Sequence, residues 1–218
     1  MSESDPRLSS TIVVTRDDDS GLEVLLLERS GERKPWVFPG GKLDEADRLG
    51  GGGEAGALRR AAVREADEEA GLSLDPDALV LISRWITPKI SPKRFDTYFY
   101  LASVAADTAV EVCGSEISSH RWFAPGAALS AHHASEIRLA PPTFVSVTWL
   151  AGQPDSASAA RALATDDPIT FRPRIHPIED GACMLYPGDV GYEAGDISLP
   201  GPRHRLVTRP EGWEYERT

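Results

Sequence analysis

The chain has 218 residues, of which 41% are hydrophobic and 26% are charged, and these proportions are ordinary for a globular protein that buries a core. The 34 Asp and Glu residues outnumber the 23 Lys and Arg residues, and the formal net charge of −11 disfavours nucleic acid and anionic membranes as partners. The sequence lacks both the apolar run of about 18 residues that a membrane span needs and the pattern of an N-terminal signal peptide. Its two cysteines, Cys113 and Cys183, are typical of reduced thiols, so the cytoplasm is the expected location.

Apolar and β-branched runs predict the strands, and Pro and Gly residues mark their ends. In chain order, the expected strands are residues 10–16, 22–27, 36–41, 79–87, 95–104 and 119–123. The first two strands are joined by a turn rich in Asp and Gly over residues 17–21, which favours a hairpin.

Three helices are expected between or after these strands. A polar loop over residues 42–53 leads into a helix over residues 55–70, which Gly71 is placed to cap. The other two helices are expected over residues 125–133 and 142–150, where a proline near the start fits the first helical turn.

The C-terminal quarter of the chain has a different composition. Residues 153–168 are rich in Ser, Ala and Asp and predict a short surface helix or a linker. We therefore expect a main domain over residues 8–152 and an extension over residues 153–218 that packs on it, where it either closes a pocket or builds a homodimer. Strands mixed with helices indicate an α/β fold, in which a mixed sheet lies between two layers of helices (α/β/α).

The helix over residues 55–70 carries acidic side chains where an amphipathic helix carries apolar ones. Glu65 and Glu69 are one turn apart on the same face, and Glu68 lies beside them. Like charges at these spacings repel one another, and partial burial makes each carboxylate more costly. Because oxygen ligands without nearby His or Cys suit hard cations, the cluster predicts a site for Mg²⁺ or Mn²⁺.

The competing interpretation of this helix is a solvated acidic face, which Arg59, Arg60 and Arg64 would partly neutralise. The preceding strand favours the functional interpretation, because it ends in Pro39-Gly40-Gly41. Glycines at a strand end let the backbone approach a ligand closely, and a carbonyl there can join a metal shell.

The two segments together resemble the Nudix box, G-x5-E-x7-R-E-U-x-E-E-x-G-U, in which U is a bulky apolar residue. The match consists of Gly41 and the segment Arg64-Glu65-Ala66-Asp67-Glu68-Glu69-Ala70-Gly71-Leu72. Within that segment the one departure is Ala66, which is small where the family has the first bulky U.

The first half of the box departs further from the family pattern. Arg64 follows Gly41 by 23 residues instead of 14, so nine residues are inserted, and the run Gly50–Gly53 belongs to the insert. Gly56 stands where the family has its first Glu, and Glu45 and Glu54 are the candidates to replace it.

These departures resemble one branch of the family, the Nudix hydrolases that act on coenzyme A and its thioesters. The segments similar to the peroxisomal member of that branch are Gly40-Gly41-Lys42-Leu43-Asp44-Glu45-Ala46-Asp47, Trp85-Ile86-Thr87-Pro88, Arg94-Phe95-Asp96-Thr97 and Pro141-Pro142-Thr143. Lys34-Pro35-Trp36 stands where the longer coenzyme A signature has a His before Pro-Gly-Gly.

The resemblance implies that water attacks one phosphorus of a small nucleotide-type substrate, a nucleoside diphosphate linked to another moiety. It implies Glu65 and Glu69 as metal ligands, Glu68 as a further ligand or as the base that activates the water, and the Gly41 carbonyl as another ligand. Arg64 is expected to orient the glutamates by hydrogen bonds. The basic residues that are candidates for binding the substrate phosphates are Arg29, Arg33, Lys34 and Arg94.

Several alternatives stay open at this point. The catalytic base that some family members keep nearer the C-terminus has three candidates here, Glu111, Glu116 and Glu136. The substrate is coenzyme A or an acyl-coenzyme A, or alternatively ADP-ribose, a nucleotide sugar or a dinucleoside polyphosphate. A third function is a catalytically silent module that senses a nucleotide; the costly carboxylate cluster argues against it, and the missing glutamate at position 56 argues for it.

Overall fold

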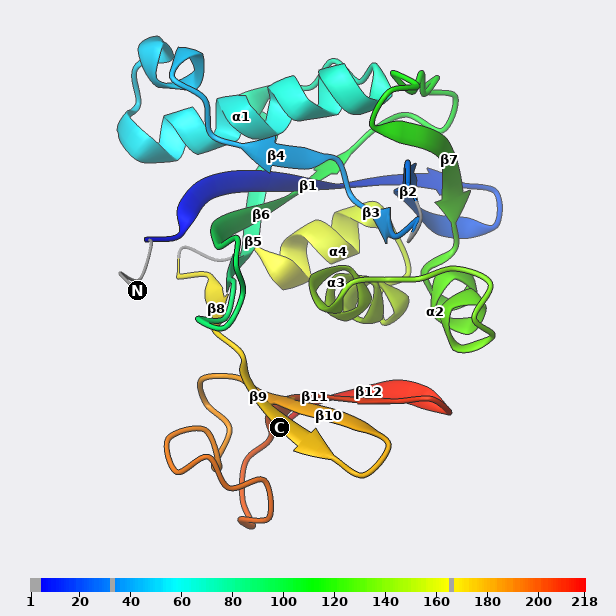
Figure 1. Ribbon diagram of the computed structural model, residues 1–218. Coiled ribbons are helices and arrows are strands. Elements are labelled where there is room, and N and C mark those ends of the chain that lie inside the picture. Colours follow the sequence, from blue (N-terminus) through cyan, green and yellow to red (C-terminus); the bar gives the residue numbers. More distant parts are fainter. Residues whose placement is uncertain (1–4, 32–33, 165–166) are drawn as a thin grey trace.

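The computed structural model describes residues 5–31, 34–164 and 167–218. Figure 1 shows helices on both faces of a large sheet and a separate small sheet beneath them. The elements in chain order are β1 (Arg7–Asp18), β2 (Gly21–Arg29), β3 (Trp36–Val37), β4 (Gly40–Lys42), the 3₁₀ helix η1 (Ala46–Gly50), α1 (Gly53–Ala70), the 3₁₀ helix η2 (Pro76–Ala78), β5 (Val80–Ile86), β6 (Phe95–Ser103), β7 (Ile117–Phe123), α2 (Pro125–His133), α3 (Pro141–Ala151), α4 (Ser156–Leu163), β8 (Ile169–Phe171), β9 (Arg174–Ile178), β10 (Gly181–Leu185), β11 (His204–Arg209) and β12 (Gly212–Arg217).

The large sheet is mixed, and β1 and β6 lie at its centre. The strand order is β3-β2-β1-β6-β5-β8, with β4 paired to β1 and β7 paired to β2. β1 and β6 run parallel, whereas β2 and β4 are antiparallel to β1. Ile12, Val13 and Val14 are fully buried in β1, as expected for a strand that is covered on both faces.

Alternating side chains of the central strands feed two separate cores, one on each face of the sheet. Ile12 and Val14 pack with Leu58 and Ala62 of α1. Val13 points the other way, into a core that includes residues of α2, α3 and α4. Helices therefore cover both faces of the sheet, and the α/β/α fold expected from the sequence is confirmed.

The C-terminal part of the chain first adds a helix and an edge strand to the large sheet and then forms a second sheet. α4 packs on the lower core through the fully buried Ala159, and β8 pairs in parallel with β5. β9–β12 then form an antiparallel sheet of their own. Phe171, Tyr186 and Leu206 belong to the same hydrophobic cluster as the main-domain residues, so one core joins the two sheets. The domain boundary at residue 152 stays a prediction.

Two expected elements differ in detail from those observed. The strand expected over residues 36–41 is split into β3 and β4 at Phe38-Pro39, since proline has no N–H to donate to a ladder. The polar loop over residues 42–53 contains η1, whose Asp47 is buried. In the described part of the chain, no helix is long and apolar enough to cross a membrane.

Candidate active site

The last turns of α1 carry the clustered carboxylates, and small residues set how close this helix lies to the sheet. Ala62, Ala66 and Ala70 are fully buried, and the Ser10 hydroxyl of β1 donates a 2.7 Å hydrogen bond to the carbonyl of Leu58. Because alanine adds little bulk, α1 lies close to β1, and its acidic side reaches the neighbouring β4.

Gly40 and Gly41 in β4 make direct contact with two of these glutamates. The Gly40 N–H donates a 2.9 Å hydrogen bond to Oε2 of Glu69. A Cβ on Gly41 would lie 2.2 Å from Oε1 of Glu65, and one on Gly40 would lie 2.6 Å from the carbonyl oxygen of Ser10. A side chain at Gly40 would collide with the backbone of β1, and one at Gly41 would displace the Glu65 carboxylate, which gives the Pro-Gly-Gly segment its physical reason.

Arg64 links the helix to the inserted loop. Its Nη1 donates to Glu65 at 2.9 Å and to Glu68 at 3.1 Å. Its Nε and Nη2 bind the two carboxylate oxygens of Asp47 at 3.2 and 3.1 Å, and Nη2 also donates to the carbonyl of Lys42. The orienting role expected for Arg64 therefore has a geometric basis. Asp47 was overlooked as a site residue, although it lies in the segment that carries the family resemblance.

Gly40, Gly41, Arg64 and the three clustered glutamates of α1 line one cavity of about 530 Å³. Its acidic lining residues outnumber its basic ones, so a bound cation would balance an excess of negative charge. The acidic residues are Asp44, Glu65, Glu68, Glu69 and Glu116, and the basic ones are Arg29, Lys42 and Arg64.

Burial makes two of the carboxylates unusually reluctant to ionise. Burial raises the pKa of Glu69 to about 7, even though the Gly40 N–H and Arg29 favour its charged form. Burial likewise raises the pKa of Glu65, while Arg64 acts in the opposite direction. Nη2 of Arg29 lies 3.5 Å from Oε1 of Glu69. An additional positive charge beside Glu65 and Glu69 would therefore stabilise the ionised state that both now resist.

The donor chemistry of the cavity fits a hard divalent cation. Its carboxylate and backbone oxygens are the ligands that Mg²⁺ and Mn²⁺ prefer, and none of the described residues that line it is His or Cys. Across residues 5–31, 34–164 and 167–218, no three His, Cys, Asp or Glu side chains already converge as a finished metal site. Instead, the Arg64 guanidinium pairs with Glu65 and Glu68, and the Gly40 N–H donates a hydrogen bond to Glu69.

The basic residues singled out in the sequence lie in different places. Arg29 lines the cavity. Arg94 does not line it, and its Nε donates to the carbonyl of Thr87 at 3.4 Å. Lys34 is an exposed residue with a positive φ of 36° outside the cavity lining. Arg33 lies outside the described residues.

The acidic candidates are also separated by the fold. Of the three candidate bases, Glu116 lines the cavity, whereas Glu111 bonds through its N–H to the end of α1 at Ala70 and Glu136 follows α2. Neither Glu45 nor Glu54 lines the cavity, and both are exposed. Asp44 is the acidic lining residue contributed by the segment between β4 and η1.

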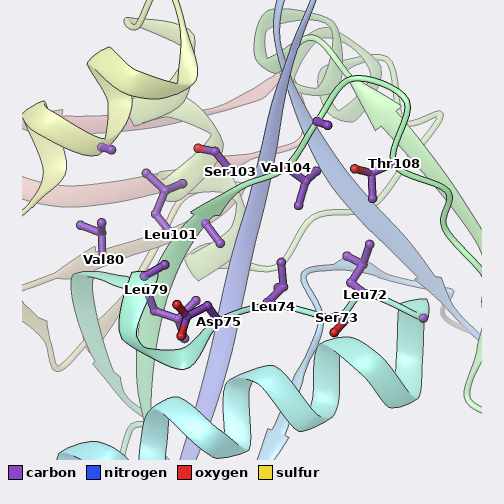
Figure 2. A pocket seen from close by; sticks show the side chains of 15 residues that line it. Leu72, Ser73, Leu74, Asp75, Leu79, Val80, Leu101, Ser103, Val104 and Thr108 are labelled. Atoms are coloured by element: carbon purple, nitrogen blue, oxygen red, sulfur yellow. The ribbon is translucent and has the colours of Figure 1, made fainter.

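A larger cavity, of about 600 Å³, lies further along β6. Figure 2 shows its mostly apolar lining, with Val104 pointing toward Leu72 and Leu74. Its described lining residues include no Lys or Arg, so a phosphate there would lack a counter-charge. The acidic cavity is therefore the candidate active site.

The family model described as the NUDIX domain matches residues 5–143, a span that contains the whole acidic cavity. The chain belongs to the Nudix family. It is a Nudix hydrolase, an enzyme that acts on nucleoside diphosphate derivatives.

Three comparisons place the chain among known Nudix proteins. It is 27% identical to a Caenorhabditis elegans protein that bears the name nudix hydrolase 7, over 84% of this chain and 74% of that protein. It is 30% identical to the acyl-coenzyme A diphosphatase NUDT19 of Xenopus laevis, over 59% of this chain but only 36% of that longer protein. The crystal structure of a Nudix hydrolase from Alicyclobacillus acidocaldarius superimposes with a TM-score of 0.65 at 23% identity, covering 76% of this chain and all of that one; this likeness establishes the fold.

Proposed function

We propose that this enzyme hydrolyses the diphosphate linkage of its substrate with the help of Mg²⁺ or Mn²⁺ held by Glu65 and Glu69. One observation carries the proposal. A single cavity is lined by the Nudix-box carboxylates, the backbone of Gly40 and Gly41, and the guanidinium of Arg29. That combination provides ligands for a cation and a positive group for a phosphate at the same place.

The side chains divide the work of the reaction between them. A bound cation would neutralise the phosphoryl oxygens and ease the attack of water. Glu65 and Glu69 are the proposed ligands, together with the carbonyl of Gly41. Arg64 keeps the carboxylates of Glu65 and Glu68 oriented through its Nη1. Arg29 is the group that would bind a phosphoryl oxygen, since a guanidinium donates two parallel hydrogen bonds to such groups.

Glu116 is the base that we propose for the attacking water. Glu116 is far from the α1 glutamates in the sequence but lines the same cavity. It is brought there because β7, which begins at the next residue, pairs with β2 at Arg29. Glu68, which is exposed and bonded to Arg64, is the second candidate for the role.

We further propose coenzyme A or an acyl-coenzyme A as the substrate. Two similar proteins, from Xenopus laevis and Homo sapiens, are named acyl-coenzyme A diphosphatases and are 30% and 32% identical over the matched parts. The segments Trp85–Pro88 and Arg94–Thr97, which resemble that branch, flank the β5–β6 turn, and Phe95 and Thr97 line the acidic cavity.

The test is a substrate panel with purified protein and Mg²⁺ or Mn²⁺. The panel contains coenzyme A, hexanoyl-coenzyme A, ADP-ribose, a nucleotide sugar and diadenosine tetraphosphate, and mass spectrometry identifies the products. We expect cation-dependent cleavage of the diphosphate, fastest with the coenzyme A compounds. Equal or faster cleavage of ADP-ribose would reject the coenzyme A assignment, and no cleavage at all would favour a sensing module.

The variant Glu69→Gln tests the cation site in the same assay. It keeps the shape of the side chain but removes a ligand charge, so we expect turnover to fall by more than about 100-fold, beyond the roughly 10–100-fold effect of outer-shell partners. Glu54→Gln is the matched control, because Glu54 is exposed in the first turn of the same helix and lies outside the cavity lining. Wild-type turnover in Glu69→Gln would reject the assignment.

A further inference from the structure

A second cavity, also of about 530 Å³, adjoins the acidic one. This volume lies within the range of roughly 300–1,000 Å³ that small-molecule sites occupy. The two cavities are contiguous because they share part of their walls, namely Thr11, Arg29, Gly40, Phe95 and Thr97.

The two cavities differ sharply in charge. All the acidic residues lie in the first cavity, and the only charged residue among the described residues that line the second is Arg29, at the shared wall. The rest of the second cavity is lined mainly by aliphatic, aromatic and proline side chains. A substrate lying across both would have its diphosphate at Arg29 and an uncharged portion beyond it.

The far wall of this second cavity comes from the C-terminal sheet. Ile175 of β9, Met184 of β10 and Tyr186 line it there, and Trp85 of β5 and Pro141 of α3 are among the lining residues from the large sheet and its helices. The residues that form this wall lie beyond the span that the family model matches, residues 5–143.

Aromatic packing fixes the C-terminal sheet in this position. Tyr186, directly after β10, meets the ring of Trp85 edge-on at 5.6 Å and the ring of Phe171 edge-on at 4.9 Å. Trp85 and Phe171 in turn stack on each other within the large sheet, with a centroid distance of 3.9 Å and an interplanar angle of 1°. Phe171 and Tyr186 are fully buried. The wall is thus anchored to the main domain, while Met184 supplies a flexible side chain that adapts to different apolar shapes.

The second cavity is poorly suited to a nucleobase. A base is recognised by several donors and acceptors along its edge. Apart from Arg29, the Trp85 indole N–H and the Tyr186 hydroxyl, which donate to Ser83 Oγ and Met184 Sδ, the polar side chains among the described lining residues are threonines. Two of these are already engaged: Thr87 Oγ1 accepts from the Phe95 N–H at 3.0 Å, and Thr97 Oγ1 lies 2.7 Å from Ser9 Oγ. A buried base would therefore leave polar groups unpaired, whereas an alkyl arm would not.

We infer that the second cavity binds an apolar arm attached to the diphosphate on the side away from the nucleoside, and that the C-terminal sheet selects substrates by this arm. The inference rests on the proposed diphosphatase activity of the adjoining cavity. Ile175 is the specificity-determining residue that is best placed for a test, because it lines the cavity yet is 38% exposed. A charge introduced there enters the arm site without being forced into the core.

The experiment uses the full chain, Mg²⁺ and three ADP esters that share one diphosphate and differ only in a methyl, butyl or octyl group. For the wild type we expect KM to fall at least about tenfold from the methyl to the octyl ester, since each buried methylene favours binding, with little change in kcat. In Ile175→Glu the rise in KM should grow with chain length and remove this trend. Ile90→Glu is the matched control, because Ile90 is 80% exposed and does not line the cavity.

Three results would overturn the inference. The first is a wild-type KM that does not depend on chain length. The second is an equal rise in KM for all three esters in Ile175→Glu, as expected if the cavity held the base. The third is the loss of the chain-length trend in Ile90→Glu as well. If the wild type cleaves none of the esters, the diphosphatase proposal fails separately. In that case the binding of the methyl and octyl esters, measured by calorimetry, decides the present inference. Tighter binding of the octyl ester that is lost in Ile175→Glu would support the inference, and equal binding of the two esters would overturn it.

Discussion

The surroundings of Glu69 act in opposite directions on its protonation state, and a bound cation would favour the ionised form. Its side chain is almost fully buried, which favours the neutral acid, yet it accepts a hydrogen bond from the Gly40 N–H and lies near Arg29, which favour the carboxylate. The outcome is a pKa raised to about 7. At neutral pH the residue therefore changes charge readily, and cation binding and proton binding compete for it.

This competition predicts that cation binding releases protons. Below about pH 7 Glu69 is protonated and a poor ligand, so the Mg²⁺ concentration that gives half-maximal activity should rise as the pH falls from 8 to 6. Calorimetry in buffers of different ionisation enthalpy measures the released proton directly. In Glu69→Gln the release should be smaller. An activation constant that stays flat across this pH range would contradict the prediction.

The helix α1 is positioned by glycines at both of its ends. The insert approaches it so closely that a Cβ on Gly56 would lie 2.8 Å from the carbonyl oxygen of Gly51. The inserted loop therefore leaves no room at position 56 for the first glutamate of the Nudix box. At the other end Gly71 adopts φ 66°, and the N–H groups of Gly71 and Leu72 bond to the carbonyls of Asp67 and Ala66, which closes the turn that carries the glutamates.

Gly71→Ala should therefore destabilise the protein. A left-handed conformation costs a residue with a Cβ about 1–2 kcal/mol, and the new Cβ would also lie 3.2 Å from Glu111 Cβ. Urea denaturation followed by circular dichroism measures the change in the free energy of unfolding. Gly126→Ala in α2 serves as control, since a Cβ there meets no atom within 4 Å. Equal effects of the two substitutions would show that the cap is unimportant.

At the scale of the whole molecule, the core on the lower face of the large sheet also joins that sheet to the C-terminal sheet. His204 lies in it, with its ring 5.0 Å from Phe171 and 5.2 Å from Tyr186. Its Nδ1 lies 2.6 Å from the carbonyl oxygen of Pro187, and its buried Nε2 has no hydrogen-bond partner within the described part of the chain. Burial lowers the pKa of His204 below its usual 6.5, because a proton on Nε2 would find no acceptor.

The position of His204 predicts a loss of stability in mild acid. The unfolded chain takes up the proton near pH 6.5, whereas the folded chain resists it, so this contribution is present above pH 6.5 and is lost as the pH falls toward the lowered pKa. Glu69 acts in the opposite direction, because its raised pKa makes the folded state bind a proton first. The difference in unfolding free energy between the wild type and His204→Phe, measured from pH 7.5 to 5, isolates the histidine. An unchanged difference across that range would contradict the prediction.

Local patterns predicted the elements and the carboxylate cluster because both depend on neighbours in sequence. Periodicity, proline and glycine placed the helices at 125–133 and 142–150 to within a residue of α2 and α3, and the spacing of Glu65, Glu68 and Glu69 is a property of one helix. The partners of these residues were harder to predict. Asp47 reaches Arg64 across an insert whose path no periodicity describes. Which of the three candidate bases lines the cavity depends on which strand pairs with β2.

The sequence alone was sufficient for the family, the mixed α/β architecture and the helix that carries the clustered carboxylates, since short-range geometry and a spaced motif encode them. The adjoining apolar cavity and its wall from Ile175, Met184 and Tyr186 became visible only in the tertiary structure. Its walls come from segments about 175 residues apart in the chain, from Thr11 to Tyr186, and burial against a distant segment leaves no periodic trace in either one.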